Sequence, residues 1–222
     1  MISFRELYAT AVLHKGGESA VESLLPKAKS ASQLRKQSDA YYLSSLCLRI
    51  FRAGLKHDMV DRRWPAFEQA FNNFDPFLCA MLSDDELDVH MSNKSLIRHL
   101  GKIKSIRANG LFLQDVAKEA GSFGQWLADW PVEDTVGLWL ALKKRGSQLG
   151  GMSGPYFLRM VGKDTFLITR DVAAVLVAQG VVEKAPTSQK ELKKAEDTFK
   201  QWREECGRPY CEISRIVSMT TL

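Results

Sequence analysis

Residues 149–157 read LGGMSGPYF, and this stretch decides the fold of the chain. Its three glycines, Gly150, Gly151 and Gly154, predict a turn that is too tight for side chains. Pro155 suits the first turn of a following helix, because its missing N–H would have no partner there. The start of such a helix directs N–H groups outward, which suits a bound phosphate.

The segment before this turn, 137–145, predicts a helix that ends in the basic run Lys-Lys-Arg. Helix, glycine turn and second helix together form a helix–hairpin–helix motif over about 137–162. Four residues adjoin the turn, and we interpret them with its glycines as candidates for contact with a phosphate backbone: Lys143, Lys144, Arg145 and Ser153. A chain of this pattern is expected to bind an anionic polymer.

One carboxylate, Asp171, follows the turn after the apolar run at 166–168. Two interpretations are open: a catalytic carboxylate facing a cleft, or the N-cap of the apolar helix that follows, since aspartate caps helices well. Lys163 lies between turn and carboxylate, and we expect it to face solvent or to lie near a phosphate.

Length and composition indicate an ordinary globular protein. The chain has 222 residues, of which 45% are hydrophobic and 26% charged, and these values leave ample material for a core. A net charge of +5 and a pI near 9.0 favour an anionic partner without identifying it. Four widely spaced cysteines without a Cys-x-x-Cys pair predict reduced thiols in a cytosolic protein.

The helical spacing of apolar residues, with almost no period-two alternation, predicts an all-α fold. We expect one domain over 1–222, with two helical subdomains around a central cleft. No apolar run reaches membrane-spanning length and the start lacks a signal-peptide pattern, so we expect a cytoplasmic protein that does not bind a membrane. We also expect a monomer. Two further patterns are an aromatic stripe and a basic stripe. The aromatic stripe is interpreted as core and comprises Trp64, Phe67, Phe71 and Phe74. The basic stripe is interpreted as either a DNA-facing or a solvated helix face and comprises Arg98, Lys102, Lys104 and Arg107.

Five short motifs then occur in a fixed order. They are FRAGL at 51–55, FDP at 74–76, IRHLGKI at 97–103, GSF at 121–123 and ALKKRG at 141–146. In this order they resemble the DNA-3-methyladenine glycosylase I family. The glycine turn with Asp171 resembles the wider helix–hairpin–helix superfamily of base-excision DNA glycosylases. Together the two resemblances cover about residues 40–171.

The resemblance implies a DNA-repair enzyme. In the superfamily the hairpin grips duplex DNA, a damaged base is flipped into a pocket, and an aspartate at the place of Asp171 serves removal of the base. Members that also cut the strand carry a lysine after the hairpin. Here that place falls close to Pro155, so the resemblance implies a monofunctional glycosylase.

The chain departs from the family at the base pocket. Arg49 stands where the family has a glutamate, and His57 where it has a stacking tryptophan. Each could serve the pocket or lie on a solvated surface. Tyr41 and Tyr42 are also candidates to line the pocket, although one of them is expected in the core.

Metal and cofactor expectations follow from the same comparison. The family's zinc ligands have no clear counterparts, since no histidine is paired with a cysteine at ligand spacing, and no structural zinc is expected. The hairpin carbonyls are candidates to hold a monovalent cation.

Two main functions remain open at this stage. One is hydrolysis of the N-glycosidic bond of alkylated purines such as 3-methyladenine, which leave readily because they already carry positive charge. The other is DNA binding on the same scaffold with lost catalysis or altered specificity, favoured by Arg49 and His57. A helical interaction domain that binds no nucleic acid would leave the glycine hairpin unexplained.

Overall fold

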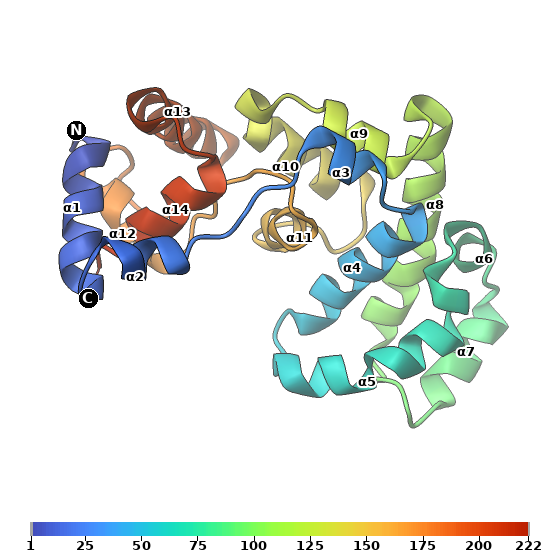
Figure 1. Ribbon diagram of the computed structural model, residues 1–222. Helices are drawn as coiled ribbons and strands as arrows, with labels where there is room; N and C mark the ends of the chain where they lie inside the picture. Colours follow the sequence, from blue (N-terminus) through green and yellow to red (C-terminus); the bar gives the residue numbers. More distant parts are fainter. Residues whose placement is uncertain (1, 222) are drawn as a thin grey trace. The chain divides into compact units, whose positions relative to one another are not determined.

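Helices form the regular structure of residues 2–221, the part of the chain that the computed structural model describes, and no strand occurs there. This confirms the all-α prediction. The chain divides into two compact units, each described here by itself (Figure 1). The central unit contains 30–130 and 140–161, and the terminal unit contains 131–139 and the described residues of 1–29 and 162–222. The prediction of one domain stays a prediction.

The central unit is built around its longest helix, α8. Its elements are α3 (Ala31–Arg35), α4 (Asp39–Arg52), α5 (His57–Ala70), η1 (Asn72–Phe74), α6 (Pro76–Ala80), α7 (Asp84–Ser92), α8 (Leu100–Ala120), α9 (Phe123–Asp129) and α11 (Ser153–Val161). Helices α4, α6, α7 and α9 pack against α8, and α11 packs against α4. Helix α8 begins at Leu100, after the N-cap His99.

The terminal unit joins the two ends of the chain. Its elements are α1 (Phe4–Lys15), α2 (Glu18–Ser23), η2 (Val132–Asp134), α12 (Arg170–Ala178), α13 (Gln189–Cys206) and α14 (Tyr210–Ser218). Helix α14 packs against α1, α12 and α13 (Figure 1). Helix α10 (Thr135–Arg145) begins in this unit and ends in the central one.

Local capping signals set many helix starts. The Ser38 side chain caps α4, and Ser83 with Glu86 forms a capping box at α7. The Asp75 carboxylate caps α6, whose first residue is Pro76. A capping box at Ser30 starts α3.

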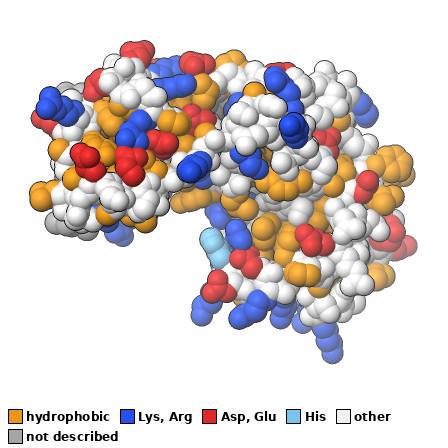
Figure 2. Space-filling model, viewed as in Figure 1, with side chains coloured by type: hydrophobic (Ala, Val, Ile, Leu, Met, Phe, Trp, Pro, Cys, Tyr) orange, Lys and Arg blue, Asp and Glu red, His pale blue; other side chains and the backbone are white. Residues whose placement is uncertain are grey.

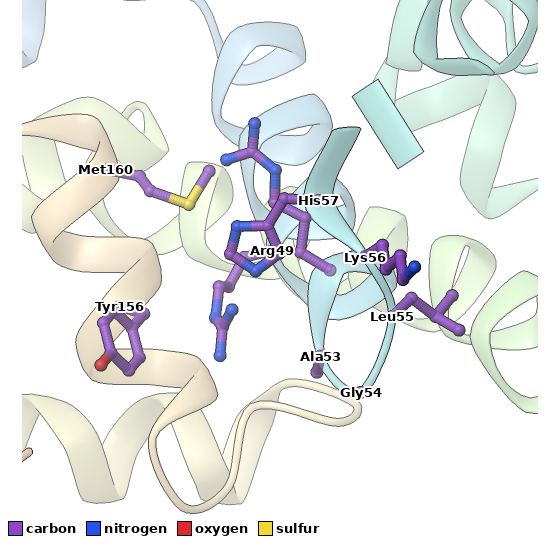
Figure 3. A pocket seen from close by; sticks show the side chains of 9 residues that line it. Arg49, Ala53, Gly54, Leu55, Lys56, His57, Tyr156 and Met160 are labelled. Atoms are coloured by element: carbon purple, nitrogen blue, oxygen red, sulfur yellow. The ribbon is translucent and has the colours of Figure 1, made fainter. Parts of the chain in front are cut away.

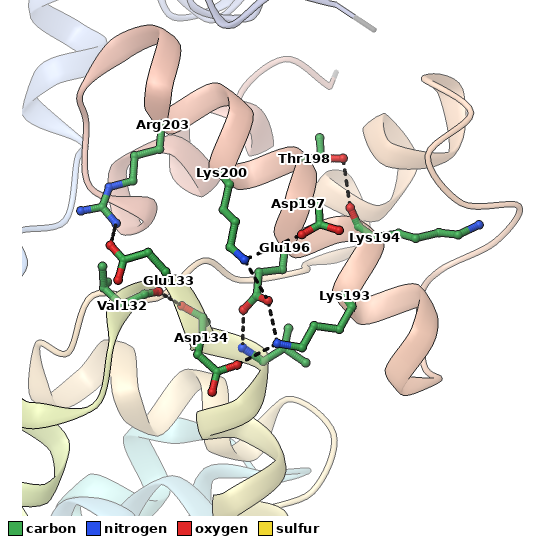
Figure 4. Close-up of polar contacts among 12 residues, drawn as sticks. Val132, Glu133, Asp134, Lys193, Lys194, Glu196, Asp197, Thr198, Lys200 and Arg203 are labelled. Carbon is green, nitrogen blue, oxygen red and sulfur yellow. Dashed lines mark hydrogen bonds and ion pairs between the residues drawn. The ribbon is translucent and has the colours of Figure 1, made fainter.

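Three other helix starts are capped by carboxylates from distant parts of the chain. Asp39 accepts a hydrogen bond from the N–H of Phe123 at α9 (2.9 Å). Asp164 accepts from two N–H groups at the start of α14 (2.9 and 3.1 Å). The buried carboxylate of Glu196 accepts from the N–H of Val136 (2.8 Å) at α10. It also pairs with Lys193 (2.9 Å), as Figure 4 shows. Tertiary structure therefore completes what the local sequence leaves unpaired.

Aromatic side chains fill both cores. The predicted stripe is confirmed, because Trp64, Phe67, Phe71 and Phe74 are buried and their rings stack in the central unit. In the terminal unit the Phe166 ring stacks on Phe199 at 4.4 Å. No helix among residues 2–221 combines the length and the apolarity needed to cross a membrane.

Candidate active site

The glycine-rich stretch connects α10 to α11. Helix α10 ends at Arg145, residues 146–152 turn, and α11 begins at Ser153. Pro155 is the third residue of α11, so the helix starts two residues before the proline that was expected to open it. Its missing N–H still lies in the first turn, where helices lack N–H partners anyway.

The glycines of the hairpin differ in what a side chain at their positions would meet. Gly151 has φ +57°, which favours glycine. A Cβ at Gly154 would lie 3.0 Å from the carbonyl oxygen of Leu149. The tightest position is Gly146, where a Cβ would lie 2.5 Å from the Leu149 side chain. Gly150 meets only ordinary contacts, with the side-chain stem of Lys143.

A buried asparagine of α8 holds the turn in place. Asn109 is fully buried, and its amide donates to the carbonyl of Ser147 (3.1 Å) and accepts from the Ser147 N–H (2.8 Å). The side chain of Gln148 also donates to the carbonyl of Gly101 (2.6 Å). The turn is thus attached to α8 at two neighbouring residues, Ser147 and Gln148.

The basic residues beside the turn fall into two groups. Arg145 makes two hydrogen bonds to Glu119 (2.7 and 2.8 Å) and lies over the Phe112 ring, so it anchors the end of α10. Lys143 and Lys144 are exposed, and neither forms a hydrogen bond or ion pair with another residue of the described range. These two lysines remain the candidates for phosphate contact, together with the half-buried Ser153.

The basic stripe on α8 does not form a DNA-facing row. Lys102 is only 7% exposed, and its ammonium donates to the carbonyls of Phe51 (3.2 Å) and Ala53 (2.6 Å). Burial, and then the charge of Arg49, lowers the pKa of Lys102. Arg107 pairs with Asp84 (2.8 Å). On the face seen in Figure 2, basic and acidic side chains are interspersed rather than separated.

Asp171 is the second residue of α12, in the terminal unit. Thr169 is the N-cap and accepts from the N–H of Val172 (3.3 Å), so the N-cap interpretation of Asp171 was wrong. Its side chain is half-buried and forms no hydrogen bond or ion pair with any other residue of 2–221. The positive end of the helix dipole favours a carboxylate in this first turn. Its catalytic role and a cleft shared with the hairpin stay predictions.

The segment before α12 is not solvent-facing. Lys163 is 7% exposed, so the expectation that it faces solvent was wrong. The backbone on both sides of Lys163 is held in place, since the N–H of Lys29 donates to the carbonyl of Gly162 (2.8 Å) and Asp164 caps α14. A buried lysine is not a suitable phosphate contact, and we leave Lys163 out of the proposed surface.

A cavity of about 640 Å³ lies in the central unit. Its lining consists of the loop 53–55, of two residues of α11, Tyr156 and Met160, and of four basic residues, Arg49, Arg52, Lys56 and His57. Arg49 and His57, the two positions at which the chain departs from the glycosylase I pattern, therefore lie in one cavity. Figure 3 shows the Arg49 side chain beside the ring of Tyr156.

Arg49 has no anionic partner in this cavity. Its guanidinium lies 4.6 Å from the centre of the Tyr156 ring, and its buried Nε has no hydrogen-bond partner among the described residues. Burial lowers the pKa of Arg49, Tyr156 raises it, and the charge of Arg52 lowers it. The neighbouring Arg52 differs, because it makes two hydrogen bonds to Asp61 (2.8 and 2.7 Å).

The two tyrosines of α4 have different environments. Tyr42 is fully buried and donates to the carbonyl of Leu34 (2.7 Å), so its assignment to a base pocket was wrong and it belongs to the core. Burial raises the pKa of Tyr42. Tyr41 is half-buried with its ring 5.4 Å from that of Tyr42, and it does not line the cavity. A role of Tyr41 at the base stays a prediction.

The remaining candidate site residues are metal ligands and cysteine thiols. Within 2–221 no three histidine, cysteine or acidic side chains gather as metal ligands would. The absence of zinc and a monovalent cation at the hairpin both stay predictions. None of the four cysteines forms a disulfide within 2–221; Cys47, Cys79 and Cys211 are buried and Cys206 is half-buried.

Sequence reasoning missed one residue that shapes the site and misassigned another. Asn109 was missed, although it interrupts the apolar face of α8 and an amide on such a face signals a buried polar contact. Lys102 was placed in the basic stripe, because a helix pattern alone does not show that the open end of α4 lies beside it.

Comparison with known proteins identifies the chain's relatives. A family model for methyladenine glycosylase matches residues 33–145. A DNA-3-methyladenine glycosylase of Haemophilus influenzae is 34% identical over 64 residues, which are 29% of this chain and 35% of that protein. The match therefore spans about a third of the length of this curated relative.

Solved structures show the same fold. A crystal structure of a 3-methyladenine DNA glycosylase I has a TM-score of 0.52 at 22% identity, covering 65% of this chain and 86% of that one. An 8-oxoguanine glycosylase/lyase of Methanocaldococcus jannaschii, in complex with a 15mer DNA containing 8-oxoguanine, has a TM-score of 0.57 at 15% identity, covering 96% and 95%. The fold is that of helical DNA glycosylases.

The family match spans half of the chain and contains the motifs at 51–55, 74–76, 97–103 and 121–123. It also contains Arg49 and His57, the lining residues at which the pocket departs from the pattern. The chain belongs to the methyladenine glycosylase family.

Proposed function

We propose that this chain is a monofunctional DNA-repair glycosylase that hydrolyses the N-glycosidic bond of damaged purines, with alkylated purines such as 3-methyladenine as the first class to test. Family membership supports the reaction. The observation that carries it is Asp171, a half-buried carboxylate at a helix start with no partner among residues 2–221. A carboxylate kept without a partner is available to stabilise a developing positive charge.

The reaction needs such a group. When the bond from C1′ to the base nitrogen breaks, the sugar develops positive charge, which a nearby carboxylate stabilises. The same carboxylate orients water for attack on C1′ and accepts its proton. No lysine occurs in 149–157 to attack C1′ as an amine, which supports hydrolysis without strand cleavage.

Duplex DNA containing a damaged base is the proposed partner, bound by a monomer. The hairpin would approach the strand through the start of α11, with Lys143 and Lys144 close to phosphates. Base removal requires the nucleotide to leave the stack and enter a cavity, and the 640 Å³ cavity beside Arg49 is proposed for the base. The protein would act where DNA is, in a bacterial-type cytoplasm at the nucleoid.

Substitution of Asp171 tests the proposal. Asp171→Asn removes the charge and keeps the shape, so base release from methylated duplex DNA should fall about 10²–10⁴-fold while duplex affinity is kept. Release is measured under single-turnover conditions, and binding by fluorescence anisotropy. Glu183→Gln, an exposed residue of the same unit, removes the same charge and should leave both unchanged.

The second candidate is a DNA-binding protein without catalysis. The unpartnered Arg49 in place of a pocket glutamate favours it. Duplex binding without base release by the unaltered protein, across cationic and neutral lesions, would decide for this alternative. Release that Asp171→Asn leaves unchanged would instead remove the assigned carboxylate and keep the glycosylase.

A further inference from the structure

All charged side chains that line the cavity beside Arg49 are basic. Four basic residues line it, and no acidic residue does. Arg52 is neutralised by Asp61, whereas Arg49 has no carboxylate partner in the described chain. The positive charge of the lining therefore favours a ligand that is neutral or that gains negative charge during the reaction.

An unpaired guanidinium in a half-buried place is costly, because burial removes part of its water and no counter-charge replaces it. An arginine stays protonated under these conditions. Tyr156 holds this one by stacking, which keeps its remaining N–H donors available to a ligand. Lys102 donates to the carbonyls of Phe51 and Ala53 and so holds the end of α4, from which the cavity-lining loop 53–55 continues.

We propose that Arg49 contacts the departing base and makes this pocket favour a neutral damaged purine over a cationic N-alkylated one. The inference rests on the proposed glycosylase function and names the lesion class within it. The guanidinium fork matches the adjacent acceptors of an oxopurine edge, as in its bidentate contacts to guanine.

The charge argument follows from the electrons of the reaction. The bond between C1′ and the base nitrogen breaks with both electrons going to the base. Water adds at C1′ and gives one proton to the carboxylate. A neutral purine therefore leaves as an anion that takes up this proton by way of solvent, whereas a cationic purine leaves neutral. Arg49 stabilises the first leaving group as negative charge develops, and it repels the second before reaction.

The effect separates binding from chemistry. A cationic lesion should bind weakly, because the like charge of Arg49 opposes its entry. A neutral lesion should enter freely and gain rate from a contact that strengthens only as the bond breaks. If Arg49 served only as a packing partner of Tyr156, its replacement would change both lesion classes equally.

The experiment measures single-turnover release of hypoxanthine and of 7-methylguanine from otherwise identical duplexes. We expect the unaltered protein to release the neutral hypoxanthine faster than the cationic 7-methylguanine. In Arg49→Gln, hypoxanthine release should fall about 10²–10³-fold, with 7-methylguanine release unchanged or increased. Arg49→Glu should reverse the preference. Arg62→Gln, an exposed arginine of α5 that does not line the cavity, is the matched control.

The outcomes are distinguishable from failure of the glycosylase proposal. Release of both bases in a ratio that does not depend on residue 49 overturns the role of Arg49 alone. A preference of the unaltered protein for the cationic lesion also overturns it, without any variant that needs to fold. No release of any lesion by the unaltered protein overturns the glycosylase proposal and this inference with it.

Discussion

Lys102 and Lys104 lie two positions apart on α8 and show how the partner of a charge decides its role. Lys102 is buried and bonded to the open carbonyl end of α4, whereas Lys104 is exposed. Helix ends leave carbonyls without partners. A lysine that reaches such an end therefore belongs to the structure even where its position in the helix pattern indicates a surface residue.

Replacing Lys102 tests this assignment. Lys102→Met leaves the carbonyls of Phe51 and Ala53 without their donor, so the free energy of unfolding should fall by about 1–3 kcal/mol. Urea unfolding followed by circular dichroism measures it. Lys104→Met should change stability by no more than about 0.5 kcal/mol. Equal effects of the two substitutions would contradict the capping role of Lys102.

At the scale of elements, the hairpin is a rigid turn supported from outside itself. The backbone of Ser147 is bonded to Asn109, and the side chain of Gln148 donates to the carbonyl of Gly101 on the same helix, α8. Gly146 and Gly154 allow close approach of neighbouring atoms. A turn that grips a strand must hold its N–H groups in a fixed direction, because a loose one loses binding free energy in ordering them. Support from α8 provides that stiffness.

Asn109→Leu removes the support. Both backbone groups of Ser147 lose their partner, so stability should fall by about 1–3 kcal/mol. Amide hydrogen exchange in 146–152 should become faster and duplex affinity weaker. The control is Gln114→Leu, on the same helix as Asn109, which removes a hydrogen bond to the carbonyl of Pro76. It should leave exchange in the turn unchanged. Protected amides in Asn109→Leu would show that the turn is held by its glycines alone.

At the scale of the whole molecule, the net charge is +5. On the face seen in Figure 2 the basic side chains are not collected in a single patch, and several basic residues form ion pairs. Much of the positive charge is neutralised locally, as at Arg145 and Arg208. Binding to DNA should therefore depend on the few lysines without partners near the hairpin, more than on the overall field.

Replacing Lys143 and Lys144 together by glutamine should reduce the slope of log affinity against log salt by about two, because each lysine neutralises one phosphate. Anisotropy titrations with duplex DNA at several salt concentrations measure the slope. The control pair Lys184→Gln and Lys190→Gln makes the same change in net charge in the terminal unit. Equal slopes for the two double variants would assign the effect to net charge instead of to the hairpin.

The sequence by itself determined the helices, their local caps and the aromatic core. Ser38, Ser83 with Glu86, and Asp75 cap within a few residues, and the stripe from Trp64 to Phe74 repeats with the helix period. These features depend on neighbours along the chain, which a sequence displays directly. Motif order likewise indicated the family that the comparison confirms.

Only the tertiary structure decided which polar groups are free. Tyr42 and Lys163 were candidates for contact with DNA, and both are buried. Asp171 was a possible helix cap and is not, since Thr169 caps α12. Whether a side chain is paired depends on residues far away in sequence that folding brings beside it, and periodicity carries no information about those neighbours.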